Sequence, residues 1–210
     1  MFPMPSRQVV LREDAWNQPP HGTLLLRALR RSDKAQWYEV RRENREWLQP
    51  WEATIPLGLD DASGLAQTYE DYVRSLSKSA RSGDSYMWGM FLDDAFVGQI
   101  SLGSVSLGSL RGATIGYWVS SAVAGRGVTP TAVAMVMDHA FLGMRLHRIE
   151  INIRPENSAS LRVAEKLGLR REGLRKQYLH INGQWADHVS FAITEDEVGA
   201  GIMNRWRESL

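Results

Sequence analysis

The sequence contains no cysteine among its 210 residues. This absence excludes disulfides, thiolate metal ligands and a cysteine nucleophile. Long apolar runs are also missing. Nowhere do about 18 apolar residues follow one another, so no membrane-spanning helix is expected. Residues 1–14 hold no apolar stretch fit for a signal peptide. We therefore expect a cytoplasmic protein.

A strong charge of either sign is absent as well, because the formal net charge is +1. We therefore expect neither nucleic acid nor an anionic membrane as a direct partner. The five histidines show no metal-ligand spacing, so no metal is expected. What is present is an ordinary globular composition, with 43% apolar and 23% charged residues. We divide the chain into an N-terminal extension (1–22), one folded domain (23–195) and a C-terminal tail (196–210), for which a helix is one alternative.

Apolar periodicity and turn signals predict the order of the elements. Asp93-Asp94 and Asn182-Gly183 mark two hairpins. Strands are expected at 23–29, 86–92, 95–107, 113–119, 148–154, 174–181 and 184–193. Helices are expected at 33–47, 62–79, 130–141 and 158–167, with a loop at 48–60. This order predicts an α/β fold with a mixed, mainly antiparallel twisted sheet of about six or seven strands, flanked by helices.

The stretch VAGRGVTPTAVAM, residues 123–135, holds two glycines in front of a predicted helix. Gly125 and Gly127 allow positive φ and a close approach of backbone to a ligand. Thr129-Pro130 suits an N-cap and the first helical position. Unpaired amides at a helix start favour an anion, most often a phosphate. Neither a Walker A loop nor a complete G-x-G-x-x-G is present, so simple loop geometry without a ligand stays open.

The combination of motifs is more specific than the loop alone. IGYWV precedes GRGVT, and RIEINIRPENSASLRVAEKLGLRREG and the Asn-Gly hairpin follow. Over residues 23–193 this order resembles the GNAT (Gcn5-related) N-acetyltransferase family, and within it the RimJ/RimL branch, which acetylates protein N-termini. The resemblance implies the GNAT fold and acetyl-CoA as cosubstrate. It further implies an acyltransferase in which an amine attacks the thioester directly, and we expect a protein N-terminal α-amine, as for ribosomal-protein-alanine N-acetyltransferases.

The resemblance also implies which residues bind the cofactor. Loop amides would hold the pyrophosphate, Asn157 would bond the pantetheine arm, and a strand amide at Trp118 or Val119 would donate to the thioester carbonyl. The hydroxyl of Ser160 would lie near the sulfur and act as a weak acid, directly or through water, unless no acid is needed. The full implied cofactor set is Trp118, Val119, Gly125, Arg126, Gly127, Val128, Thr129, Asn157 and Ser160. From the residues alone, Asn157 is equally well explained as an N-cap.

Two positions depart from the family pattern. Ala124 stands where arginine or glutamine is usual, and Ala164 stands where many members have a tyrosine that protonates the departing thiolate. These departures favour one alternative, a non-catalytic CoA-binding module. An N-acetyltransferase for a small amine or an antibiotic is also left open, because the mixed charges of residues 33–60 do not decide the acceptor. The oligomeric state is left as monomer or homodimer.

The acceptor side is less defined. Glu52 is the candidate general base, with Glu43 and Glu46 as alternatives, although each also fits a solvated surface charge. Trp47, Trp51 and Tyr117 are candidate substrate-binding residues, and core packing explains them as well. His180 and Asp187 face each other across the predicted hairpin and favour a structural over a catalytic pair. The basic residues of 162–176 fit a solvated face or a site for the 3′-phosphate of CoA.

Overall fold

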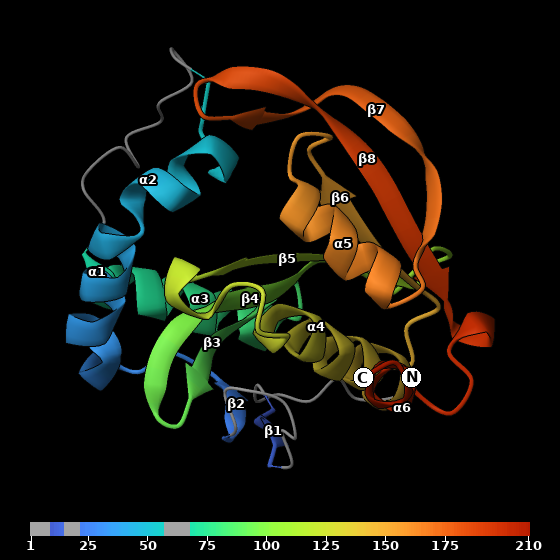
Figure 1. The fold of residues 1–210 in the computed structure, drawn as a ribbon, viewed down its shortest axis with the longest axis horizontal. Helices are drawn as coiled ribbons and strands as arrows, with labels where there is room; N and C mark the ends of the chain where they lie inside the picture. Colours follow the sequence, from blue (N-terminus) through green and yellow to red (C-terminus); the bar gives the residue numbers. More distant parts are fainter. Residues whose placement is uncertain (1–8, 15–21, 57–67) are drawn as a thin grey trace.

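The computed structural model describes residues 9–14, 22–56 and 68–210. Its sheet has eight strands in the order β1-β2-β3-β4-β5-β6-β8-β7 (Figure 1). The strands are β1 (Leu11–Glu13), β2 (Leu24–Arg27), β3 (Tyr86–Leu92), β4 (Ala95–Ser106), β5 (Gly112–Val119), β6 (Arg148–Ile153), β7 (Arg170–Ile181) and β8 (Gln184–Thr194). The predicted mixed and mainly antiparallel sheet is confirmed, with one strand more than expected. The extra strand is β1, an edge strand of three residues, too short to show a period of two.

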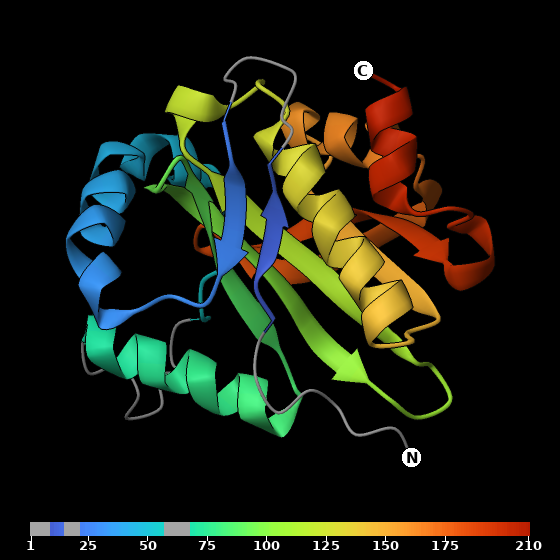
Figure 2. The same cartoon turned by 90° about the horizontal axis from the view of Figure 1, so that it is seen from below.

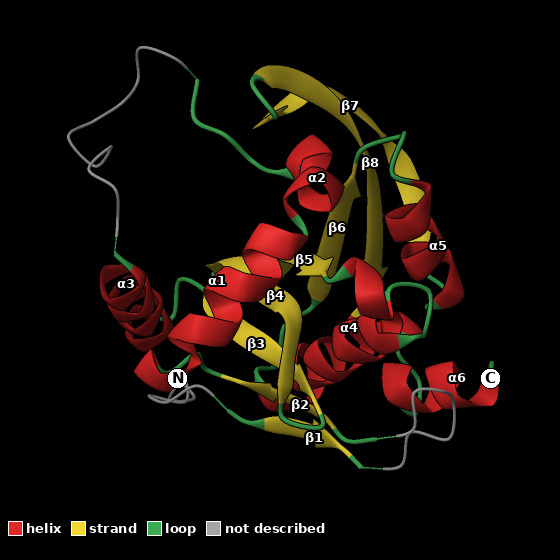
Figure 3. Ribbon diagram, turned by 60° about the vertical axis from the view of Figure 1, so that its left-hand side comes forward, coloured by secondary structure: helices red, strands yellow, loops and turns green. Residues whose placement is uncertain are grey.

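The helices are α1 (Lys34–Glu43), α2 (Arg45–Leu48), α3 (Tyr69–Ser82), α4 (Val128–Asp138), α5 (Ser158–Lys166) and α6 (Ile202–Glu208). In Figures 2 and 3, α1 and α3 lie on one side of the sheet and α4 and α6 on the other. The main core joins α4 to β3 and β4. A second apolar cluster lies under α1 and α3 around Phe91 and Phe96. The sheet is therefore covered on both faces.

Helix α4 is buried along its length, from Val128 to Met137. Its polar Thr131 accepts a hydrogen bond of 2.6 Å from the indole Nε1 of Trp206 in α6. The carboxylate of Asp138 in turn accepts the amides of Ile202 and Met203 at 2.7 and 3.1 Å. These bonds satisfy the first amides of α6 and hold it against α4. Residues 202–208, part of the segment that we treat as a tail, thus pack on the main core.

Two predicted helix boundaries are wrong. The helix expected over 33–47 is interrupted at Asn44, which separates α1 from α2, and a 3₁₀ turn, η2 (Gln49–Trp51), follows within the expected loop. Helix α4 begins at Val128, with Gly127 as N-cap, so Thr129 is not the cap. The left-handed φ of +81° at Gly127 turns the chain into the helix two residues before Pro130. The helix expected at 62–79 is observed from Tyr69, and positions 62–67 lie outside the described residues.

The parallel strands β5 and β6 pair over only three positions. Gly112, Ala113 and Thr114 oppose Arg148, Ile149 and Glu150. Beyond these pairs the two strands separate toward their carboxyl ends (Figure 1). In open α/β sheets, ligands bind at carboxyl ends where neighbouring strands part. The chain leaves β5 into the glycine turn and leaves β6 into the start of α5, so both candidate motifs flank this gap.

Candidate active site

The end of β5 turns a backbone amide into the gap between β5 and β6. The Ser120 amide donates to Val97 of β4 at 2.8 Å, the bond that flanks the non-hydrogen-bonded pair Gly98 and Val119. Because the amides of an antiparallel strand alternate in direction, those of Ser120 and Trp118 face β4, and that of Val119 faces the gap. The Val119 carbonyl accepts from Trp47 Nε1 at 3.0 Å. Of the two strand residues expected to meet a thioester, only Val119 has the required direction.

The glycine turn presents further amides beside this gap. A 3₁₀ turn, η4 (Ser121–Val123), leads into it, and Gly125 and Gly127 have φ of +77° and +81°. A Cβ placed on Gly125 would meet nothing within 4 Å, so the space on that side of Gly125 is open. The Arg126 amide already donates to Val123 at 3.4 Å. Within the described chain, no acceptor is found for the amides of Gly125, Gly127, Val128 and Thr129. The dipole of α4 adds to the preference of these amides for an anion.

A buried asparagine anchors the turn. Asn44 is 2% exposed. Its Oδ1 accepts the amide and the hydroxyl of Ser121 at 2.8 and 2.9 Å, and its Nδ2 donates to the Ser120 hydroxyl at 3.1 Å. Sequence reasoning missed this residue, because a single asparagine between charged neighbours carries no local signal for burial. Its contacts fix η4, from which the glycine turn departs, to the α1–α2 break.

The start of α5 forms the other wall of the gap. Asn157 is the N-cap, and its side chain accepts the Ser160 amide at 3.1 Å, which confirms the capping role. The phenol of Tyr117 donates to the Ser160 carbonyl at 3.4 Å. Tyr117, a candidate substrate-binding residue that core packing explains as well, thus lies against the start of α5. Burial raises the pKa of Tyr117, so the phenol keeps its proton at neutral pH. Ala164 is fully buried in the main core.

The segment 47–54 bridges the carboxyl ends of β5 and β6, a place that we call the mouth of the gap, and it is tied to three neighbouring elements. Trp47 bonds β5 as described, and Arg154, at the end of β6, donates to the Pro50 carbonyl at 2.9 Å and lies 5.6 Å from the Trp51 ring centre. Backbone bonds of Glu52 and Thr54 fasten the segment to the tip of the β7–β8 hairpin. The candidate residues Trp47, Trp51 and Glu52 all lie on this segment and contact β5, Arg154 and Arg41, respectively. The Glu52 carboxylate pairs with Arg41 of α1.

The remaining acceptor-side candidates are Glu43, Glu46, His180 and Asp187. Glu43 and Glu46 are exposed on α1 and α2. His180 and Asp187 do not pair, which corrects the expected cross-strand pair. His180 bonds Thr54 through Nδ1 at 2.8 Å, whereas Asp187 accepts the Gln177 amide at 2.8 Å. The reason is the two-residue turn, which pairs Ile181 with Gln184 and therefore sets His180 opposite Trp185, two residues before Asp187.

Two of the six basic residues of 162–176 have carboxylate partners among the described residues. Arg170 pairs with Glu172 and Glu197, and Arg175 pairs with Glu150 at 2.7 Å. Hydrogen bonds from Arg148 and Arg170 lower the pKa of Glu172 to about 2. These pairs favour the interpretation of a solvated face.

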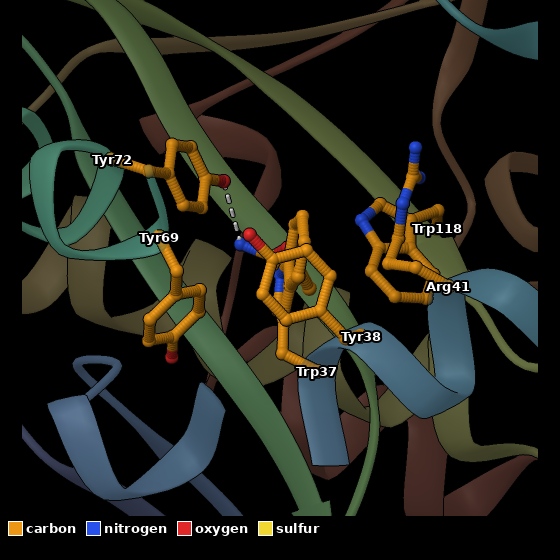
Figure 4. A pocket seen from close by; sticks show the side chains of 7 residues that line it. Trp37, Tyr38, Arg41, Tyr69, Tyr72 and Trp118 are labelled. Atoms are coloured by element: carbon orange, nitrogen blue, oxygen red, sulfur yellow. Dashed lines mark hydrogen bonds between the residues drawn. The ribbon is translucent and has the colours of Figure 1, made fainter. Parts of the chain in front are cut away.

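An aromatic pocket opens on the α1–α3 face of the sheet, and it was not expected from the sequence (Figure 4). It has a volume of about 370 Å³. Trp118 contributes to its wall from β5, one residue before Val119. The pocket is lined by Trp37, Tyr38, Arg41, Tyr69, Tyr72, Gln99 and Trp118. The available signal in the sequence was the aromatic residues at 37, 38, 69 and 72. It was not sufficient, because these residues lie on two separate helices that are brought together only by the tertiary fold.

The site combines three features: a mixed sheet whose parallel strands β5 and β6 separate, a glycine turn with free amides at the start of α4, and the capped start of α5. Together these features are typical of a scaffold for acyl transfer. The chain belongs to the GNAT acetyltransferase family, since the acetyltransferase (GNAT) domain model matches residues 23–170. The chain is accordingly an acetyltransferase. Among the described residues, no helix has both the length and the apolar character needed to cross a membrane. In the same described ranges, no group of three or more His, Cys, Asp and Glu side chains is placed to hold a metal ion.

Individual relatives agree with this assignment. The protein named "Probable N-acetyltransferase YjcK" of Bacillus subtilis (strain 168) is 33% identical over 173 residues, covering 81% of this chain and 93% of the relative. The [ribosomal protein uS5]-alanine N-acetyltransferase of Escherichia coli (strain K12) is 27% identical, covering 81% and 87%. The structure of Mycobacterium smegmatis RimJ in complex with CoA-disulfide has a TM-score of 0.82 and 37% identity, covering 96% of this chain and 93% of that one. The resemblance to the RimJ/RimL branch is confirmed.

Proposed function

We propose that this acetyltransferase moves the acetyl group of acetyl-CoA to the N-terminal α-amine of a protein. The observation that carries the proposal is the set of unpaired backbone amides at Val119 and in the glycine turn, which follows β5 where β5 and β6 are no longer paired. Two findings on relatives support it. The Mycobacterium smegmatis RimJ structure is a complex with CoA-disulfide, and the Escherichia coli relative is named for an alanine of a ribosomal protein.

The residues of the gap fit the cosubstrate. The amides of Gly125, Gly127, Val128 and Thr129 supply donors for a pyrophosphate, and their charge preference does not depend on the side chain missing at Ala124. The Arg126 amide is engaged in the turn, so we assign it a smaller part than expected. Asn157 and Ser160 lie at the opposite wall. When bound, acetyl-CoA supplies an activated acetyl thioester.

The protein's own groups then account for the transfer. The Val119 amide donates to the oxygen on which negative charge develops. Glu52, at the mouth, accepts the proton of the incoming amine through water, and an α-amine with a pKa of about 8 needs only a weak base. The Ser160 hydroxyl acts as a weak acid that gives a proton to the departing thiolate, directly or through water. Trp47 and Trp51 hold the acceptor at the mouth. Positioning of the amine and the thioester contributes more to the rate than proton removal does. We place the enzyme in the cytoplasm, where nascent protein N-termini arise.

The first experiment measures acetyl-CoA binding to the full chain by thermal shift and titration. At a ligand concentration 100-fold above Kd, the free energy of unfolding should rise by about 2.7 kcal/mol. Gly127→Val should weaken binding at least about ten-fold, because valine is strained at φ +81° and would displace the turn. Gly83→Val is the matched control, since Gly83 has φ +83° at the end of α3, far from the turn. Equal effects of the two variants on Kd would count against the turn as binding site.

The second experiment follows CoA-thiol release with peptides that carry a free N-terminus. Acetylated peptide and thiol should form in equal amounts, and an N-terminally blocked peptide that contains lysine should be inert. Glu52→Gln should lower kcat, whereas Glu46→Gln, exposed on neighbouring α2, should not. Turnover confined to small amines would replace the protein acceptor by a small-molecule one.

A further inference from the structure

The aromatic pocket has walls suited to a ring. Trp37 packs against Tyr38, Tyr69 and Tyr72 with ring centres 5.1, 5.5 and 5.7 Å apart. Trp118 closes the other side of the pocket (Figure 4). Aromatic side chains prefer edge-to-face or offset contacts with other rings, and such pairs are favoured beyond their area of contact. The walls therefore favour a planar apolar guest.

The inner polar groups of the pocket offer a hydrogen-bond donor. The Trp37 indole donates to Gln99 Oε1 at 2.8 Å, and Gln99 Nε2 donates to the Tyr72 hydroxyl at 3.0 Å. Because Gln99 is only 2% exposed, these two hydrogen bonds hold its side-chain amide in one orientation. The Tyr72 hydroxyl already accepts a bond, and in the described chain no acceptor is found for its own proton. Tyr69 differs, because its hydroxyl donates to the Arg30 carbonyl at 3.0 Å. A guest that brings an acceptor atom can therefore bond Tyr72.

The charge of the pocket is balanced. The Arg41 guanidinium lies 5.3 Å from the Trp118 ring centre and 5.8 Å from that of Trp37. Its charge is matched by Glu52. A cationic guest would compete with Arg41 for the same rings, and an anionic guest would compete with Glu52. Neutral guests face neither cost.

The position of the pocket relates it to the acceptor. Trp118, in its wall, directly precedes Val119, whose amide faces the gap, and Arg41 joins the pocket to Glu52 at the mouth. An amine that attacks beside Val119 carries its side chain on the next atom.

We propose that the aromatic pocket binds the side chain of the acceptor's first residue and favours an aromatic one, with tyrosine preferred for its hydroxyl. This inference rests on the proposed function and specifies its substrate class. A methyl group such as that of alanine would fill only a small part of about 370 Å³. The selectivity of this chain thus differs from the alanine for which the Escherichia coli relative is named.

The test compares kcat/KM for peptides that differ only at the first residue: alanine, serine, aspartate, lysine, phenylalanine and tyrosine. Phenylalanine and tyrosine should exceed alanine by about ten-fold or more. Lysine and aspartate should show no such gain. An alanine peptide acetylated as fast as the aromatic ones would overturn the inference and leave the proposed function intact.

Variants locate the preference in the pocket. Tyr72→Phe should lower the tyrosine-to-phenylalanine ratio of kcat/KM several-fold, because it removes the donor and keeps the ring. Tyr178→Phe, on β7 and outside the pocket, is the matched control for that ratio. Tyr38→Ala, at a side chain 47% exposed, should reduce the preference for both aromatic peptides without loss of folding. Unchanged ratios in both pocket variants would refute the assignment.

Small amines separate failure of the inference from failure of the proposed function. If no peptide is acetylated, tyramine, phenethylamine and ethylamine are compared in the same assay. A preference for the two aromatic amines, lost in Tyr38→Ala, would support the pocket and reject the protein acceptor. Equal rates for all three amines, or no turnover at all, would overturn the pocket assignment.

Discussion

Replacing Asn44 by alanine tests whether the glycine turn is held from a distance. The side chain makes bonds to Ser120, Ser121 and the Val40 carbonyl, all between 2.8 and 3.4 Å. Ser121 is exposed and can bond water instead, and the Val40 carbonyl keeps the Asn44 amide. What is lost without replacement is the hydrogen bonding between Asn44 and the buried Ser120 hydroxyl. The volume of the removed side-chain amide is left as a small cavity. We expect the free energy of unfolding to fall by about 2 kcal/mol.

Cofactor binding should weaken with it. Releasing η4 lets the turn sample conformations that do not bind. We expect the Kd for acetyl-CoA to rise about ten-fold, which corresponds to about 1.4 kcal/mol of binding free energy. Denaturant unfolding and titration with acetyl-CoA measure the two effects on one sample. Asn204→Ala is the control, since Asn204 is exposed on α6 and, among the described residues, its Nδ2 bonds only the Ala200 carbonyl, just before that helix. Lower stability with an unchanged Kd would refute the anchoring role.

The remaining predictions concern stability. Glu172 has a folded pKa of about 2, below its ordinary 4.5, so its contribution is present above about pH 4.5 and is lost as the pH falls toward 2. The pKa of Asp33 is lowered too: burial opposes the change, but hydrogen bonds from Arg27 and the Arg30 amide outweigh it. The Tm should fall over this acid range, and Glu172→Gln should flatten the fall; an equally steep curve would contradict the assignment. Trp206→Phe removes the bond to Thr131 and should lower stability by about 1–3 kcal/mol in denaturant unfolding, whereas no change would show that α6 does not depend on it.

The parts of the fold that were predicted correctly are those with local causes. The hairpins at Asp93-Asp94 and Asn182-Gly183 follow from turn residues that tolerate positive φ, and both positions show it. Asn157 caps α5 through a bond three residues away. The break at Asn44 has no such cause, because its partner Ser121 is 77 positions distant. The start of α4 was misplaced since proline marks a favourable first position, while the glycine before it decides where the turn ends.

The candidate site divides in the same way. The glycine turn and the cap of α5 are visible as motifs, but the acceptor side is assembled from segments that meet only in the fold. Trp47 and Glu52 are placed by bonds to β5, to α1 and to the β7–β8 tip. A single segment therefore links β5, β6 and the β7–β8 tip. Under the proposed function, its position sets the distance between the amide of Val119 and the acceptor. Specificity in this chain then depends on contacts that leave no periodic trace in the sequence, and it can change between relatives while the cofactor motifs stay the same.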